Sequence, residues 1–198
     1  MLAFAGLAVI LVAGVAALVA FGGGDEGGSA AINSRYCQEE SFPGLQPEHL
    51  QSPDEKVTYN SFPPSSGPHF QQWAPWGIYD EPIKQTIPVH NLEHGGIVIQ
   101  YGNVGEETVR EIESFFQEDP NGLVVAPLPR LGKKIALTAW NAPRYPRNQG
   151  EPGEVDAGNG YVLTCTQWDA DAAAEFRDKR RGKAGERFPV SDLVPGSQ

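Results

Sequence analysis

The residues with the clearest potential for chemistry are the chain's four histidines, His49, His69, His90 and His94. Imidazole is the commonest side-chain ligand for transition metals. The last two histidines stand four apart in the segment VHNLEHGG, where Pro88 can open a helical turn and Gly95 can close it. Residues four apart on such a turn have Cβ atoms about 5–6 Å apart, so both rings can reach one ion. The spacing predicts a metal site built on the last three histidines, with His49 as a fourth ligand or a support.

The remaining composition limits which metal this predicted site would bind. The only methionine is Met1, which excludes an axial thioether ligand and a thioether cage for Cu(I). Imidazole with water or a carboxylate suits Cu(II), zinc or iron, and copper heads the affinity order for such ligands. Copper is therefore the metal that the sequence favours. Glu93 and Tyr59 are interpreted as supporting residues, because a helical turn is expected to point Glu93 away from the ion.

The chain has two cysteines, Cys37 and Cys165. In an exported domain an even pair of cysteines indicates a disulfide, and closing so long a loop stabilises a fold by about 4–5 kcal/mol in the chain-entropy model. A thiolate metal ligand is the alternative. The pairing is favoured because an oxidising compartment promotes it.

The N-terminal fifth of the chain is predicted to lie outside the folded domain. Residues 1–22 carry no charged side chain, and about 20 apolar residues suffice for a helix to cross a bilayer. We expect a single-pass anchor in the cell membrane, with a cleaved secretory signal as the alternative. The Gly-rich residues 23–35 are predicted to form a flexible tether, and residues 36–198 one extracytoplasmic domain.

The formal net charge of −10 argues against a nucleic-acid partner, because neutralising phosphates requires basic surfaces. The one basic run, RDKRRGK at 177–183, is predicted to sit at a solvated helix end, where cations are favoured, and not to form a binding patch. The partners that the sequence indicates are therefore the membrane and a metal ion. A protein partner does not follow from these features.

The two halves of the domain differ in how regular they are. Residues 38–96 are rich in Pro, Ser, Gly and aromatic residues, which predicts irregular backbone pinned to the domain body. Periodic apolar patterns in the second half predict two helices, at 105–119 and 169–182, and three strands, at 96–102, 122–128 and 133–140. Residues 160–168 fit either a strand or a helix start. The order predicts an α+β domain with a small mixed or antiparallel sheet and two helices.

Four segments together resemble the family catalogued as domain of unknown function 3105. They are YNSFPPSSGPH at 59–69, APWGIY at 74–79, VHNLEHGG at 89–96 and IALTAW at 135–140. Members of that family carry similar motifs, with an upstream His like His49 and a Cys like Cys37. Phe62 and Ser65 depart from the usual Asn and Thr. The resemblance implies an anchored or exported bacterial domain and assigns no reaction to it.

Three functions are compatible with these residues. The predicted function is an anchored metal-binding protein. A metal-dependent enzyme could use the same histidine centre, since an open position on the ion can activate water or O₂. In the third, a structural or interaction module, the histidines only satisfy buried backbone groups. A hydrolase using Ser65 or Ser66 with His69 is disfavoured, because SSGPH lacks the nucleophile-elbow pattern.

Overall fold

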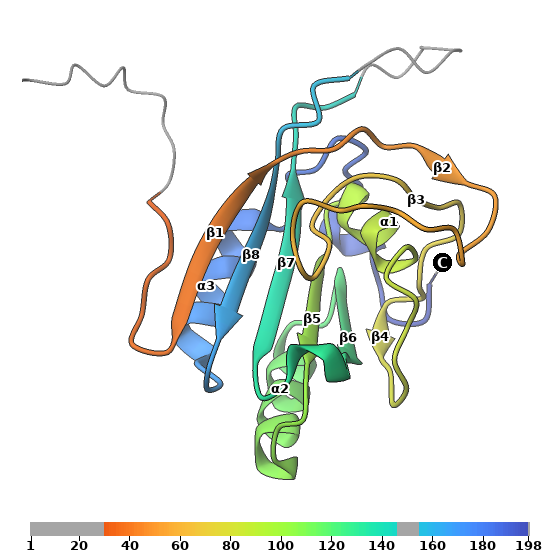
Figure 1. Cartoon of the computed structure of the whole chain (residues 1–198). Helices are drawn as coiled ribbons and strands as arrows, with labels where there is room; N and C mark the ends of the chain where they lie inside the picture. The colour runs from red at the N-terminus through yellow and green to blue at the C-terminus, as the bar shows by residue number, and fades with distance from the viewer. Residues whose placement is uncertain (1–29, 146–154, 198) are drawn as a thin grey trace, which may run out of the picture.

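The computed structural model describes residues 30–145 and 155–197. This part of the chain forms a six-stranded mixed sheet, a separate two-stranded sheet and three α-helices (Figure 1). In order across the larger sheet the strands are β1 (Cys37–Pro43), β8 (Asn159–Cys165), β7 (Ile135–Asn141), β5 (Ile97–Tyr101), β6 (Leu123–Pro127) and β4 (Gly77–Ile78). The predicted α+β class with a small mixed sheet is confirmed.

The sheet is antiparallel from β1 to β5 and parallel from β5 to β4. Parallel neighbours need a crossover connection, and α2 (Glu106–Glu118) supplies it between β5 and β6. Gly105 precedes the helix, and Glu106 and Glu107 occupy its first turn, where the helix dipole favours acidic residues. The predicted helix and the two strands on either side of it are therefore confirmed.

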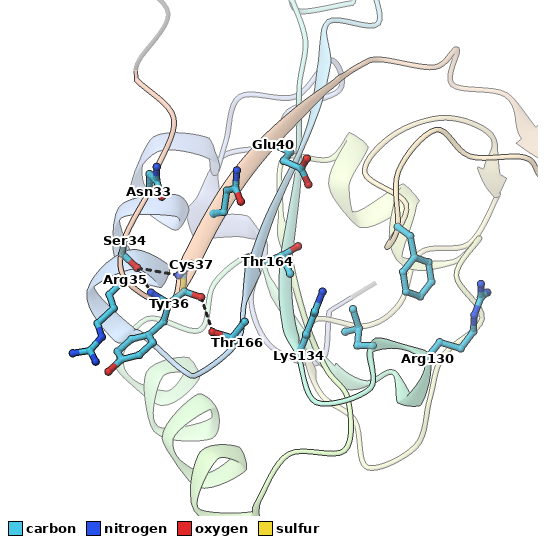
Figure 2. Close-up of a pocket in the computed structure, with 13 residues that line it drawn as sticks. Asn33, Ser34, Arg35, Tyr36, Cys37, Glu40, Arg130, Lys134, Thr164 and Thr166 are labelled. Carbon is cyan, nitrogen blue, oxygen red and sulfur yellow. Dashed lines mark hydrogen bonds between the residues drawn. The ribbon is translucent and has the colours of Figure 1, made fainter.

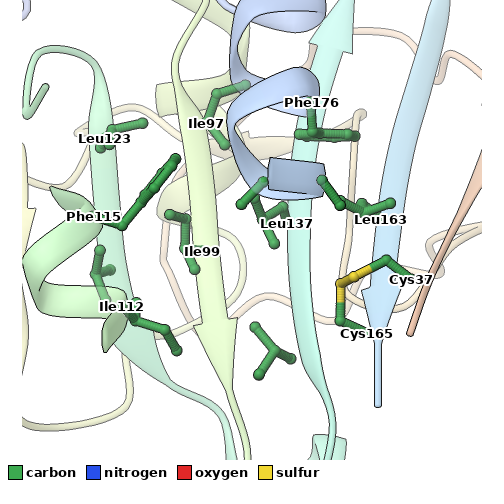
Figure 3. Packing of buried hydrophobic residues seen from close by; sticks show 14 of the residues in the cluster. Cys37, Ile97, Ile99, Ile112, Phe115, Leu123, Leu137, Leu163, Cys165 and Phe176 are labelled. Atoms are coloured by element: carbon green, nitrogen blue, oxygen red, sulfur yellow. A yellow bond between two sulfur atoms is a disulfide. The ribbon is translucent and has the colours of Figure 1, made fainter. Parts of the chain in front are cut away.

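Two apolar layers enclose the larger sheet, one on each face. Ile97 and Ile99 of β5 point to the face covered by α2 and by α3 (Ala170–Arg180), where they join Phe115 and Phe176 (Figure 3). Val98, between those isoleucines, joins the opposite layer, to which α1 (Pro88–Glu93) also contributes. This alternation follows from the two-residue period of a strand. The face of β5 that carries Val98 therefore packs against α1.

The structure tests three sequence predictions: the C-terminal helix, the ambiguous run before it and the number of helices. The helix expected at 169–182 is α3, and the Asp169 side chain caps it by accepting a hydrogen bond from the Ala172 N–H, at 3.1 Å. Of the ambiguous residues 160–168, residues 160–165 belong to strand β8, which ends at Cys165. The prediction of two helices is wrong, because the turn at VHNLEHGG is a helix in its own right, α1.

The prediction that residues 38–96 are irregular is also wrong in part, because β1 pairs with β8 along its whole length. Its sequence, CQEESFP, lacks the apolar alternation that marks a strand. The two residues that β1 buries are Cys37 and Glu39, and neither is an ordinary core residue. Glu39 accepts a 2.8 Å hydrogen bond from the guanidinium of Arg180. The buried side chains of β1 therefore form an ion pair and a disulfide instead of aliphatic contacts.

The end of the expected tether contacts the domain. Ile32 is buried, and its N–H donates to Glu39 Oε2 at 2.8 Å. Ser34 Oγ donates to Asp169 Oδ2 at 2.7 Å. The expected membrane anchor at 1–22 lies outside the described residues. Within the described residues, the structure contains no helix that is both long enough and apolar enough to span a bilayer.

The predicted disulfide is present between Cys37 and Cys165, which are 128 positions apart in the sequence. The two cysteines are directly paired in the register of β1 and β8, and both are buried. The bond therefore joins the edge strand of the sheet to its neighbour near one end of the pair.

Replacing both cysteines by serine is expected to lower the free energy of unfolding by about 2–5 kcal/mol, since the disulfide restricts the unfolded chain. Urea denaturation of the oxidised wild type and the Cys37→Ser/Cys165→Ser variant measures the difference. Reduced wild-type protein is the matched control and should behave like the variant. Equal unfolding midpoints for the oxidised wild type and the variant would contradict the expectation.

An ion pair joins the C-terminal ends of α2 and α3. The Arg181 guanidinium donates to Asp119 Oδ2 at 2.5 Å and to the Asn121 carbonyl at 2.8 Å, and Arg177 Nε lies 3.6 Å from the same carboxylate. The hydrogen bond from Arg181 lowers the pKa of Asp119 below its ordinary value. This contact fixes where the chain leaves α3.

Asp119→Asn is expected to destabilise the protein at pH 7 by no more than about 1 kcal/mol, because the carboxylate is partly exposed. The folded-state pKa lies below the unfolded value, so the contribution is complete above the ordinary aspartate pKa of about 3.9. It is lost as the pH falls through the folded-state pKa. Urea denaturation of wild type and variant at several pH values from 7 to 3 tests this. A difference that grows on acidification would contradict it.

Candidate metal centre

The VHNLEHGG segment forms α1 and the turn that ends it. Pro88 occupies the first turn of the helix, and Gly95 follows the end with a φ of +93°, a conformation that glycine adopts without strain. The helical turn expected between these two residues is therefore confirmed. All six residues of α1 are buried, so its polar side chains point into the protein.

Asn91 fastens α1 to the APWGIY segment. Its side chain is fully buried, accepts a hydrogen bond from the Ala74 N–H at 2.9 Å and donates to the Ala74 carbonyl at 2.8 Å. Gly96 lies against Trp76 of the same segment, and a Cβ at this position would come within 2.3 Å of the indole ring. Two of the segments that resemble the family are thus packed together.

His49 and His69 are brought together by the small two-stranded sheet. Its strands, β2 (His49–Leu50) and β3 (His69–Phe70), run parallel with the two histidines in register. Residues in register point to the same side of a sheet, and the two ring centroids are 5.0 Å apart. Tyr59 supports this arrangement from outside the site, because its hydroxyl donates to the Pro68 carbonyl at 2.6 Å.

His90 of α1 completes a group of three imidazoles. Its ring centroid lies 4.5 Å from that of His69 and 5.2 Å from that of His49. One ligand atom from each of these histidines and from Glu93 lies within 4.8 Å of the others. Metal–nitrogen bonds of about 2.0–2.1 Å place tetrahedral donors roughly 3.4 Å apart, so modest side-chain adjustments would bring all four onto one ion. We call these four residues the inner group.

Backbone carbonyls fix the protonation of two of these rings. His69 Nδ1 lies 2.8 Å from the Gly67 carbonyl, and His90 Nδ1 lies 2.9 Å from the Phe70 carbonyl. A carbonyl only accepts, so each Nδ1 carries the proton and donates. Metal-bound histidines have this same outer hydrogen bond, which leaves Nε2 with a free lone pair.

Glu93 faces His69 inside the protein. His69 Nε2 and Glu93 Oε2 are 3.0 Å apart and buried, yet neither atom has an aligned hydrogen-bond partner among the described residues. The expectation that Glu93 points away is wrong, because its three-residue spacing from His90 puts both on one side of α1. Two buried lone-pair atoms this close require a proton or a cation between them.

The electrostatics at His90 favour a neutral imidazole. Burial, with the neighbouring rings of His69 and His94, lowers the pKa of His90 to about 3. His90 is therefore uncharged at neutral pH, which is the form that binds metals. Burial raises the pKa of Tyr59 to about 12, so its hydroxyl keeps the proton that it donates to Pro68.

His94 belongs to a second group. Its Nε2 lies 3.6 Å from Glu186 Oε2, and ligand atoms of His90, His94 and Glu186 lie within 4.8 Å of one another. The predicted set of His69, His90 and His94 is thus divided in the described part of the chain between two groups that share His90. We call His90, His94 and Glu186 the outer group, because the Glu186 side chain is 47 % exposed.

Sequence reasoning missed Glu186, which reaches the site on the segment after α3. Gly182 N–H donates to the Gly95 carbonyl at 2.7 Å, and Glu186 N–H donates to the Glu93 carbonyl at 3.2 Å. The imidazole of His94 lowers the pKa of Glu186, which keeps its carboxylate ionised. A single glutamate after a helix carries no local signal of this role. The contact with α1 is set by the tertiary fold.

Aromatic rings border both groups. The Trp73 ring lies 5.2 Å from His90 and 4.5 Å from His94 between centroids, and Phe188 lies 4.6 Å from His94. Trp140 lies 6.4 Å from His69 on the sheet side. These rings limit the contact of the imidazoles with water, which strengthens charge interactions inside the site.

The serines of SSGPH are used elsewhere. Ser65 Oγ is 2.8 Å from Ser61 Oγ, and Ser66 Oγ accepts a hydrogen bond from the Leu45 N–H at 3.1 Å. The ring nitrogen Nδ1 of His69 is bonded to Gly67. These contacts give no support to a serine hydrolase.

An open pocket of about 680 Å³ lies away from the histidines (Figure 2). It runs along β1 and β8 and is lined by residues that include Arg35, Arg130, Lys134 and Glu40. None of the histidines contributes to it. Its cationic side chains do not suit a metal ion, so the candidate centre is the buried histidine region.

Asn91→Ala is expected to lower the free energy of unfolding by about 2–4 kcal/mol, because it leaves the Ala74 N–H and C=O buried without partners. Asn103→Ala, at an exposed position, is the matched control and should change stability by less than about 0.5 kcal/mol. Urea denaturation of the three proteins measures both changes. Equal effects of the two substitutions would show that Asn91 does not hold α1 in place.

One of three comparisons with known proteins, the one with protein-family models, agrees with the resemblance noted in the sequence. The chain matches no curated protein and no solved structure. The family model described as "Protein of unknown function (DUF3105)" matches residues 50–190, which include every residue of the inner and outer groups except His49. Because this match covers more than half of the chain, the protein belongs to the DUF3105 family.

Proposed function

We propose that this protein binds one transition-metal ion through His49, His69 and His90, with Glu93 as the fourth ligand. The observation that carries the proposal is the close approach of His69 Nε2 to Glu93 Oε2 in the interior, 3.0 Å apart and without an aligned hydrogen bond to any described residue. A divalent cation bound to both atoms would give each of them a ligand bond.

The charge of the donor set supports the same conclusion. Imidazoles are neutral when they bind a metal, so in a metal complex the three rings would contribute no charge and the Glu93 carboxylate one negative charge. A buried carboxylate without a compensating charge is costly by several kcal/mol. A divalent ion leaves a net charge of one, and the exposed edge of the site at His49 can solvate part of it. A bound ion would thus supply the compensating charge that a buried carboxylate needs.

Copper(II) is the metal that we propose. The donors are nitrogen and oxygen, because the two cysteines are bonded to each other and the only methionine is Met1. Such ligands suit Cu(II) and zinc, and copper binds more tightly to a given set of them. Zinc is the closest competitor on this argument.

We propose further that the domain acts outside the cytoplasm, anchored in the membrane through residues 1–22. The support is the uncharged N-terminal sequence and the disulfide, since structural disulfides persist in oxidising compartments. The acidic composition argues against a nucleic-acid partner there. The proposed role is thus metal handling at the outer side of a membrane.

Full-length protein purified without a histidine tag is expected to retain about one copper ion per chain after dialysis. A ligand bound only to the folded state must raise the unfolding temperature, so copper should do so for the wild type. His90→Ala should abolish the retained copper, and Glu93→Gln should weaken binding by roughly tenfold or more. Elemental analysis and calorimetric titration measure these quantities.

Glu111→Gln is the matched control for Glu93→Gln, because Glu111 is exposed on α2. It should bind copper like the wild type. Circular dichroism of each variant confirms that the fold is retained. Copper retention by folded His90→Ala, or no retention by the wild type, would contradict the proposed function.

A further inference from the structure

The outer group has the composition of a metal site in its own right. Two imidazoles and one carboxylate converge within 4.8 Å. His90 and His94 have ring centroids 4.6 Å apart, as the helical spacing of four provides. The backbone bond from the Glu186 N–H to the Glu93 carbonyl holds Glu186 beside α1. The third ligand is therefore positioned by the fold and not by the chance direction of a surface side chain.

His90 cannot serve both groups at the same time. Its Nδ1 donates to the Phe70 carbonyl, so Nε2 carries the only lone pair of the ring that is free for a metal. A neutral imidazole with one free lone pair binds one ion. When an ion in the inner group is bound to His90, His90 is not available to His94 and Glu186. When an ion in the outer group is bound to His90, His90 is not available to His49, His69 and Glu93.

We propose that His90, His94 and Glu186 form a second metal position, mutually exclusive with the inner one and linked to it by His90. The inference rests on the proposed function, because it gives the same ion an alternative set of ligands. An ion that exchanges between the positions keeps its bond to His90 while it trades His49, His69 and Glu93 for His94 and Glu186.

Each position has one exposed member, His49 in the inner group and Glu186 in the outer group, and its other members are buried. The side chains of His69 and Glu93 are 0 % and 3 % exposed, whereas that of Glu186 is 47 % exposed. Phe188, which packs on the ring of His94, is itself an exposed hydrophobic residue. An ion in the outer position therefore faces the surface, where another molecule can reach it.

Copper titration of full-length variants tests the second position. The wild type should bind one ion per chain. His69→Ala should still bind one ion, with affinity reduced roughly ten- to hundredfold and with an electron paramagnetic resonance spectrum of fewer nitrogen ligands. Adding Glu186→Gln to His69→Ala should weaken binding by roughly a further tenfold or more. The control Glu111→Gln, at an exposed position of α2, should leave the wild-type affinity unchanged within about threefold.

His49→Ala replaces His69→Ala if the latter fails to fold, because His49 is exposed and its loss disturbs no core packing. If Glu186→Gln has no added effect in either background, the second position does not exist, while copper binding by the wild type still upholds the proposed function. Two ions bound at once to the wild type would overturn the sharing of His90. Absence of copper binding by the wild type would overturn the proposed function itself and the inference with it.

Discussion

The buried approach of His69 to Glu93 is the constraint on which the account of this protein depends. An imidazole nitrogen and a carboxylate oxygen stand 3.0 Å apart without an aligned hydrogen bond, where neither reaches water. Proteins seldom leave buried polar atoms in this state, because each one carries the full cost of its lost hydration. The arrangement is understandable if the two atoms are ligands, since a cation bound to both would satisfy each of them.

The scaffold holds both partners of this pair by backbone contacts. β3 presents His69 through its pairing with β2, and the amide of Phe70 donates to the Thr86 carbonyl just before α1. α1 in turn rests on β5 and is fixed by Asn91 and by the close contact of Gly96 with Trp76. The ligand side chains thus come from short elements, but each element is tied to the larger sheet. Preorganisation of this kind is what a metal site needs to select its ion.

Much of the fold followed from apolar periodicity, and the exceptions have a physical cause. Residues 105–119 and 122–128 show the periods of a helix and a strand, and both elements are present. β1 was missed because its inward positions are Cys37 and Glu39, whose partners, Cys165 and Arg180, lie more than a hundred residues away. No local pattern can reveal a strand that is held by distant partners.

In the site, too, some residues are positioned by their local spacing in the sequence and others by tertiary contacts. The convergence of His90 and His94 on one turn could be read from their spacing, and the register of His49 with His69 could not, because it depends on a two-residue pairing. The direction of Glu93 follows from its helical spacing of three from His90 and not from its position next to His94. Glu186 is placed at the site by the hydrogen bonds of the segment 182–188 with α1 and the turn that follows it, and these contacts leave no mark in the local sequence.

The most direct test is the anomalous diffraction of crystals of this protein grown with copper. We expect one strong copper peak between the inner histidines, about 2.0–2.2 Å from His69 Nε2 and close to the Glu93 carboxylate. A copper-loaded crystal in which the peak lies only on surface residues, with His69 and Glu93 still facing each other across an empty gap, would contradict it.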